Sequence, residues 1–271
     1  MSNAPQAVTT GPVMLESVRD GIALLVMNRP ERLNSLNNEL AVGLNEALAR
    51  AAENPGVRVV VLTGAGRAFC AGGDLSMIGK GRQTGDLGGL EPVLRAGMQI
   101  VLKMRTMAQP VIAAVNGAAA GAGMNIALAA DLRIAGEEAT FGQNFAKVGL
   151  YPDYGGTFFL PELVGPAKAA EMFYLGDMID ARTAERLGLV NRVVPGAQLE
   201  AEVRALAQKL AQGPGIAMRA AKKTLFASKR EQLERALEEE VRHQLECFHS
   251  EDCAEGITAF FEKRAPKFQG K

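Results

Sequence analysis

The alternation of hydrophobic and polar residues predicts a sheet in the first part of the chain. The runs 57–63 (VRVVVLT) and 111–115 (VIAAV) are almost continuously apolar, which is typical of buried strands. Two further apolar segments, 13–18 and 22–27, flank Arg19-Asp20-Gly21 and predict a hairpin.

Helical periodicity appears between the strands. Asn37 is placed to cap a helix that runs to about residue 52, and 91–107 also reads as a helix. The Gly-rich segment 78–89 reads as a mobile loop of the kind that borders a ligand site. Strand–strand–helix units recur in this way, so we expect an α/β fold built as a right-handed spiral of ββα turns.

After residue 195 the pattern is helical throughout. Apolar residues recur every three or four positions in four segments, which are 198–212, 215–227, 230–248 and 253–264. Such a region has too small a core to stand alone, so it should pack on the front part or on a neighbouring subunit. We therefore expect a front domain at 13–195, a helical region at 196–271 and a disordered tail at 1–12.

Two predicted strands run into loops of very small residues. The run 111–115 continues through Asn116-Gly117 and a stretch of Ala and Gly into a helix that begins near Gly123, and the run 57–63 continues into 64–75. A helix N-terminus behind such a loop offers unpaired N–H groups that stabilise an anion. Close packing of helix on sheet would select the same small residues. Two such loops could supply one N–H each to a single oxygen.

Composition narrows the class of protein. The 271 residues carry 30 basic and 30 acidic side chains, which argues against nucleic acid or an anionic membrane as the main partner. No apolar run approaches a membrane span, no secretory signal is visible, and three cysteines suit a reducing compartment, so we expect a cytoplasmic protein. Cys70 reads as a small filler. His243 and His249 lie in a late helical segment and read as surface or interface residues, and two histidines are too few to indicate a metal site or a Ser-His-Asp set.

The small-residue loops also carry a family resemblance. AFCAGGDL, VNGAAAGAGMNIALAADLRIA and FGQ occur in this order, with NRPERLNSL before them and RLGLVNRVVP and FFEKRAPKF after them. Over about 14–268 the chain resembles the enoyl-CoA hydratase/isomerase (crotonase) superfamily. The resemblance implies a crotonase-like spiral of ββα units with a helical C-terminal oligomerisation region, and a homotrimer or dimer of trimers. It also implies an acyl-CoA thioester as partner, with coenzyme A as part of the substrate and no permanently bound cofactor or metal.

The same resemblance implies roles for individual residues. The N–H groups of Gly73 and Ala122 match the oxyanion hole, while Ala71 and Leu75 match backbone positions that hold the coenzyme. Arg29 and Lys263 are candidates for the coenzyme phosphates, although each could be an ordinary surface charge. The remaining members of the expected substrate-binding set are Gly72, Asp74, Gly121, Asn125 and Phe145.

Two departures from the family pattern bear on the reaction. Hydratases of the superfamily carry two glutamates, and here these positions hold Asn125 and Phe145, neither of which can act as a general base. Asp153 is then the available carboxylate. Its own surroundings leave two roles open, a proton shuttle or a cap for the turn before Thr157.

The resemblance favours the proton shuttle. KVGLYPDYGGTFFLPELVG looks like the branch of epoxyphenylacetyl-CoA isomerases and Δ3,Δ2-enoyl-CoA isomerases, which place an acid/base carboxylate at this point. We therefore expect an isomerase with Asp153 as its base. An enoyl-CoA hydratase and a weakly catalytic acyl-CoA-binding protein are the alternatives.

Overall fold

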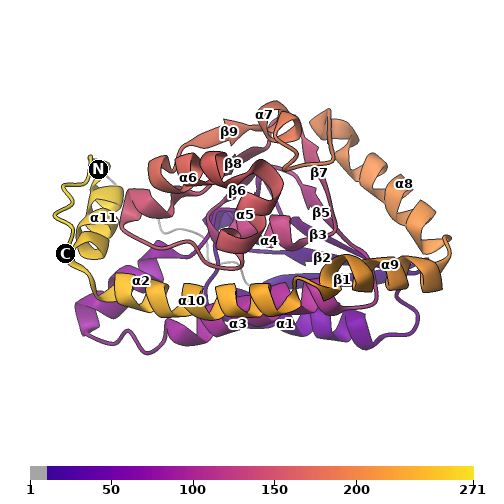
Figure 1. The fold of residues 1–271 in the computed structure, drawn as a ribbon, viewed down its shortest axis with the longest axis horizontal. Coiled ribbons are helices and arrows are strands. Elements are labelled where there is room, and N and C mark those ends of the chain that lie inside the picture. Colours follow the sequence, from indigo (N-terminus) through magenta and orange to yellow (C-terminus); the bar gives the residue numbers. More distant parts are fainter. Residues whose placement is uncertain (1–10) are drawn as a thin grey trace.

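The hairpin predicted at the start opens a six-stranded sheet in the computed structural model, which describes residues 11–271 (Figure 1). Its turn places Asp20 at φ 54° and Gly21 at φ 79°, the left-handed pair that matches the twist of a two-residue hairpin. Most of the expected tail at 1–12 lies outside the described residues. Pro12 is described, and its carbonyl accepts a hydrogen bond from Asn28 Nδ2 at 2.9 Å.

The large sheet is parallel apart from its first pair of strands. Parallel strands end at the same edge of a sheet, so the segments that follow β3 and β5 lie side by side. This arrangement is required if each segment is to supply one N–H to the same oxygen. In spatial order its strands are β1 (Met14–Arg19), β2 (Ile22–Met27), β3 (Val59–Gly64), β5 (Val111–Val115), β7 (Leu132–Gly136) and β10 (Arg192–Val194).

A second sheet of four short strands lies beyond that edge. The strands at 68–70, 118–120 and 178–180 were not predicted, because three-residue segments carry too little pattern. Close packing explains two glycines here: a Cβ at Gly117 would lie 2.0 Å from the Arg67 carbonyl oxygen, and one at Gly123 would lie 2.1 Å from that of Cys70. In spatial order the strands are β4 (Ala68–Cys70), β6 (Ala118–Ala120), β8 (Thr140–Gly142) and β9 (Met178–Asp180).

The helices of the front part follow the predicted periodicity with one exception. Asn37 caps α1 as expected, accepting a hydrogen bond from the Leu40 N–H at 2.9 Å. The loop expected at 78–89 is wrong for 78–84, because a helix capped by Asp74 extends to Thr84 and ends at Gly85 with φ 71°, whereas 85–89 is a loop as expected. These helices are α1 (Asn38–Glu53), α2 (Leu75–Thr84), α3 (Glu91–Thr106), α4 (Ala122–Ala129), α5 (Gly156–Val164), α6 (Pro166–Leu175) and α7 (Ala181–Arg186), with 3-10 turns η1 (Pro30–Arg32), η2 (Asn144–Val148) and η3 (Gly196–Gln198).

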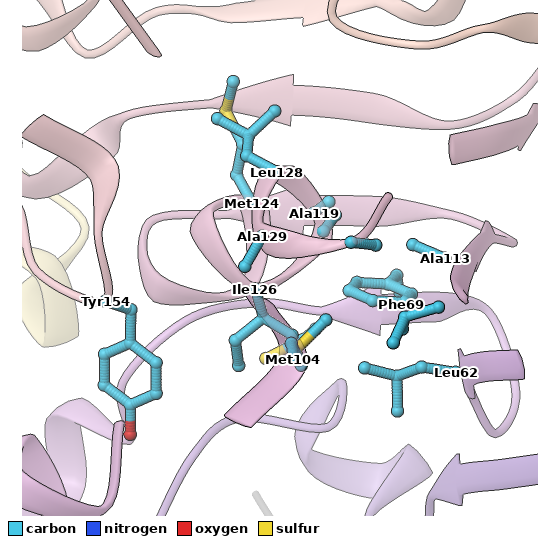
Figure 2. Close-up of a cluster of buried hydrophobic side chains, with 14 of the residues drawn as sticks. Leu62, Phe69, Met104, Ala113, Ala119, Met124, Ile126, Leu128, Ala129 and Tyr154 are labelled. Atoms are coloured by element: carbon cyan, nitrogen blue, oxygen red, sulfur yellow. The ribbon is translucent and has the colours of Figure 1, made fainter. Parts of the chain in front are cut away.

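The helices after residue 195 pack on the front part of the chain. This was one of the two arrangements expected for the region, the other being packing on a neighbouring subunit. They are α8 (Leu199–Ala211), α9 (Gly215–Ala227), α10 (Arg230–His249) and α11 (Glu251–Glu262). Strand β3 shows how the layers divide: Val59 and Val61 face α8, whereas Val60 and Leu62 face the main core. Figure 2 shows Leu62 and Phe69 in that core, near Met104 of α3.

Helix α10 crosses the molecule beside α3, as Figure 1 shows, and it also contacts α5. Its buried stripe includes Leu233, Leu237, Val241 and Phe248. Because this stripe faces the body of the same chain, α10 can place side chains against segments that lie far away in sequence.

Candidate active site

A cavity of about 900 Å³ opens at the edge where β3 and β5 end. The front part contributes both small-residue loops and the segment around Asp153, and the C-terminal region contributes α10 and α11. Of the predicted site residues, the cavity is lined by Ala71, Gly72, Gly73, Asp74, Leu75, Gly121, Ala122, Phe145 and Asp153.

Two residues that line this cavity, Gly73 and Ala122, have backbone N–H groups free of the local hydrogen-bond pattern. The Gly72 carbonyl accepts from the Leu36 N–H at 2.7 Å and the Asp74 N–H donates to the Leu36 carbonyl at 2.9 Å, so the N–H of Gly73 between them points the other way. Ala122 is the first residue of α4, and its N–H has no acceptor within the helix. At φ 97°, Gly72 brings the loops together, since a Cβ there would lie 2.9 Å from the Ala120 carbonyl oxygen and 3.7 Å from the Ala122 nitrogen.

The opposite end of α4 is neutralised by a buried cation. Arg133 donates hydrogen bonds to the carbonyls of Ala130 at 2.6 Å and Leu128 at 3.3 Å, which are the unpaired carbonyls at the end of this helix. Burial lowers the pKa of Arg133 to about 10, so it stays charged at neutral pH. A cation at the C-terminus offsets the negative end of the helix dipole and leaves the positive end to act on the cavity.

The two carboxylate oxygens of Asp153 differ, because only one of them accepts a hydrogen bond from another side chain. Its side chain is 7% exposed, and its Oδ2 accepts a hydrogen bond from Gln244 Nε2 at 3.0 Å. Its Oδ1 is buried and has no hydrogen-bond partner among residues 11–271. Burial raises the pKa of Asp153 to about 8, and the charge of Glu240 adds to the shift. The carboxyl group can therefore both take up and release a proton near neutral pH.

The capping role considered for Asp153 belongs to another residue. Glu240 accepts hydrogen bonds from the N–H groups of Gly155 at 2.7 Å and Thr157 at 2.9 Å, and also from the Thr157 hydroxyl. Burial raises the pKa of Glu240 to about 7, although these hydrogen bonds oppose the shift. The start of α5 is thus capped from α10, which leaves the Asp153 side chain to the cavity.

Sequence reasoning missed both α10 residues. Glu240 and Gln244 are each 1% exposed and lie one helical turn apart on the apolar stripe of α10. Polar residues at positions that the periodicity assigns to the core were the available signal. What they contact could not be read from the sequence, because their partners lie more than 80 residues earlier in the chain.

Asn125 and Phe145 occupy different places. Asn125 is fully buried and does not line the cavity: its Nδ2 donates to the Asp153 carbonyl at 2.7 Å, and its Oδ1 accepts from Gln143 at 2.6 Å. Phe145 lines the cavity, and a Cβ at Gly121 would lie 3.4 Å from its ring. Neither side chain can act as an acid or a base.

Neither cation predicted for the phosphates lines the cavity. Arg29 forms an ion pair with Asp74 at 3.1 Å and also donates to the Ser35 carbonyl, so its guanidinium is held inside the protein. Lys263 is exposed at the end of α11. Its neighbour Arg264 does line the cavity.

Other chemistries find little support among residues 11–271. Cys70 is buried, and burial raises the pKa of its thiol to about 12, as fits a small filler. His243 and His249 lie on α10. No cluster of three or more His, Cys, Asp or Glu side chains that could hold a metal ion occurs in the described part of the chain, and no helix there is long and apolar enough to cross a membrane.

Comparison with known proteins identifies the family to which this chain belongs. The sequence profile described as enoyl-CoA hydratase/isomerase matches residues 17–271. A probable enoyl-CoA hydratase of Rhodobacter capsulatus is 44% identical over 94% of this chain and 96% of its own. The 1,2-epoxyphenylacetyl-CoA isomerase of Escherichia coli is 38% identical over 95% and 98%. The crystal structure of an enoyl-CoA hydratase from Mycobacterium avium subsp. paratuberculosis K-10 superposes with a TM-score of 0.86 at 33% identity, covering 95% of this chain and 98% of that one.

The chain therefore belongs to the enoyl-CoA hydratase/isomerase family, and its fold is the crotonase fold of those structures. Relatives named as hydratases and as an isomerase match at similar coverage, so the reaction has to be argued from the residues in the cavity.

Proposed function

We propose that the protein is an acyl-CoA isomerase that moves a double bond by proton transfer through a thioester enolate. The single observation that carries this proposal is that buried Asp153, whose Oδ1 has no hydrogen-bond partner among residues 11–271, lines the same cavity as Gly73 and Ala122. One carboxylate suffices for an isomerase, because it takes a proton from one carbon and returns it to another. The names of the relatives support coenzyme A thioesters as the substrate class.

The proposed reaction has two proton transfers. Ionised Asp153 removes a proton from the carbon next to the thioester carbonyl of a 3-enoyl substrate, and the electron pair moves onto the carbonyl oxygen. The N–H groups of Gly73 and Ala122 stabilise that oxygen, and loss of one such donor typically costs about 3 kcal/mol. Protonated Asp153 then returns the proton to the γ-carbon, which yields the conjugated 2-enoyl thioester. The opening of an aryl epoxide thioester would use the same groups.

Hydration is the second candidate, and the name of the Rhodobacter capsulatus relative favours it. Against it stand Asn125 and Phe145 at the positions where hydratases of the superfamily carry glutamates. The deciding experiment is a panel of 3-enoyl, 2-enoyl and aryl-epoxide thioesters with identification of each product. Rapid water addition to the 2-enoyl thioester would reject the isomerase proposal.

A coenzyme A thioester-binding protein with little catalysis is the remaining alternative. Exchange of solvent deuterium into the α- or γ-carbon of a bound thioester separates it from an isomerase. We expect exchange, since the Asp153 pKa of about 8 lets the carboxyl cycle between its two states.

We also propose that the chain works as a homotrimer or a dimer of trimers. Large apolar side chains remain exposed on α6 and α11, among them Tyr174 at 78% and Phe260 at 57%. Burial of this surface between subunits would stabilise an assembly. Light scattering should give a multiple of three chain masses, and a monomeric mass would contradict the proposal.

A further inference from the structure

A single amide on α10 holds the Asp153 segment at two points. Gln244 Oε1 accepts a hydrogen bond from the Tyr151 N–H at 3.0 Å, and Gln244 Nε2 donates to Asp153 Oδ2 at 3.0 Å. A backbone N–H can only donate, so it fixes which end of the amide is the acceptor. The amide nitrogen must then face the carboxylate.

This arrangement distinguishes the two oxygens of Asp153. Oδ2 already accepts a hydrogen bond from an amide that does not ionise near neutral pH, whereas Oδ1 accepts none from residues 11–271, so Oδ1 is the favoured site for the proton that Asp153 gains. The backbone around Asp153 is held separately, by Asn125 at the Asp153 carbonyl and by Glu240 at Gly155 and Thr157. Within residues 11–271, Gln244 is the one side chain that hydrogen-bonds the carboxylate.

We propose that Gln244 is a positioning residue, which holds the Asp153 carboxylate through Oδ2 so that Oδ1 is the oxygen that exchanges the proton with substrate. This inference rests on the proposed function, in which Asp153 is the acid/base. An amide suits the task because it keeps the same donor in both protonation states of Asp153, whereas a carboxylate or a histidine at this point would itself titrate.

The charges around Asp153 define what a pH profile would report. Glu240, on α10, is the ionisable side chain whose charge raises the pKa of Asp153, while the Gln244 hydrogen bond lowers it. The Tyr154 hydroxyl donates to the Val93 carbonyl at 3.1 Å, and burial holds its pKa well above the usual range, so it stays neutral. Removal of the Gln244 donor should therefore raise the pKa of Asp153.

The test compares Gln244→Met with Gln109→Met in the full-length protein. Gln109 is also a buried glutamine whose Nε2 donates to backbone carbonyls, those of Ala52 at 3.2 Å and Ala51 at 3.3 Å, but it lies outside the cavity lining. We expect Gln244→Met to lower kcat for 3-enoyl isomerisation by about 10- to 100-fold, as for a slightly misplaced catalytic group. The acidic limb of the kcat profile, on which protonated Asp153 cannot act as the base, should move to higher pH. KM should stay within about twofold, because uniform binding is untouched.

Gln109→Met should reduce thermal stability without a shift of the pH profile. Gln244→Glu is the second variant, in case the methionine variant does not fold: it keeps the acceptor for Tyr151 but, once ionised, has no donor for Asp153, so its profile should shift further in the same direction. An unchanged kcat and pH profile in whichever Gln244 variant folds would overturn the positioning role, provided that Asp153→Asn is inactive. If Asp153→Asn is itself fully active, it is the proposed function that fails, and Gln244 then has no catalytic group to position.

Discussion

The two halves of the site differ in how they are built. The oxyanion loops follow the strands β4 and β6 directly, so Gly73 and Ala122 lie within three residues of a strand end, although the contacts that orient them reach Leu36 and join one loop to the other. The acid/base side is long-range, since Asp153 sits on an irregular segment whose geometry is set by Glu240 and Gln244. Backbone donors can therefore be recognised from a local pattern, whereas the environment of a carboxylate depends on tertiary packing.

The largest expected effect comes from a substitution on the acid/base side of the site. Asp153→Asn keeps the shape and a hydrogen-bonding tip but cannot accept a proton, so kcat for 3-enoyl isomerisation should fall by about 10² to 10⁴. Thioester affinity should stay close to that of the unaltered protein, because the contacts with the rest of the ligand remain. Steady-state kinetics and equilibrium titration with a 3-enoyl thioester measure the two quantities, and undiminished turnover would show that the proton shuttle lies elsewhere.

The second largest effect is expected from the loss of a backbone donor on the oxyanion side of the site. Gly73→Pro removes one N–H donor and should lower kcat by about 10² to 10³ while it affects binding less. Gly73→Ala is the matched control, because it retains the N–H and its Cβ meets nothing within 4 Å in the ligand-free cavity. Equal losses in the two variants would mean that added bulk, not the lost donor, is responsible.

These two sides also show how far the sequence could go. Apolar runs and caps predicted the hairpin, β3, β5 and α1, because each carries its own local signal. The prediction for 78–89 was wrong over the first seven residues. Its glycines suggested a loop, but Asp74 caps a helix that extends to Thr84, and Ile78 is buried against the C-terminal helices. The donors Gly73 and Ala122 and the carboxylate of Asp153 came from motif resemblance, and the cavity brings them together.

What the sequence could not supply is the partner of each side chain. Asn125 was grouped with the substrate-binding residues from its motif position, and only the fold shows that it ties α4 to the Asp153 carbonyl. Arg29 was a candidate for a phosphate, and the fold pairs it with Asp74. Both contacts join segments at least 28 residues apart, and no local pattern encodes them.

A smaller effect is expected from Glu240 on α10, and it tests whether this helix controls the pKa of Asp153. Glu240→Gln removes the charge that raises the pKa of Asp153, so the acidic limb of the pH profile should move to lower pH, opposite to the shift expected for Gln244→Met. The glutamine also weakens the hydrogen bonds to Gly155 and Thr157, which should lower the free energy of unfolding by about 1 to 3 kcal/mol. A pH profile and a urea titration measure these effects, and a shift to higher pH would contradict the electrostatic argument.

Stability should also depend on pH in a direction set by these carboxyls. The folded-state pKa of Asp153, at about 8, lies above the ordinary value of 3.8, so the folded protein binds more protons than the unfolded chain between these pH values. Its contribution to stability is therefore lost as pH rises from about 4 towards 8, and Glu240, with a pKa of about 7, acts in the same sense. Denaturation from pH 5 to 9 should show a decline that is smaller in Asp153→Asn, and an identical slope in both proteins would contradict this.

The smallest effects concern the two cations once assigned to the phosphates. The Arg29–Asp74 ion pair is largely shielded from solvent and stands next to Gly73, so it supports the oxyanion loop much as Gln244 supports Asp153. Arg29→Gln should lower kcat by about tenfold, as expected when a donor is displaced slightly, with a smaller change in KM. Lys263→Ala should change KM by about fivefold at most, because an exposed ion pair with a phosphate contributes up to about 1 kcal/mol. Kinetics at two salt concentrations separate these outcomes. A large, salt-dependent rise in KM for Arg29→Gln with kcat unchanged would mean that the arginine leaves Asp74 to bind the substrate, and the oxyanion loop would then stand without this support.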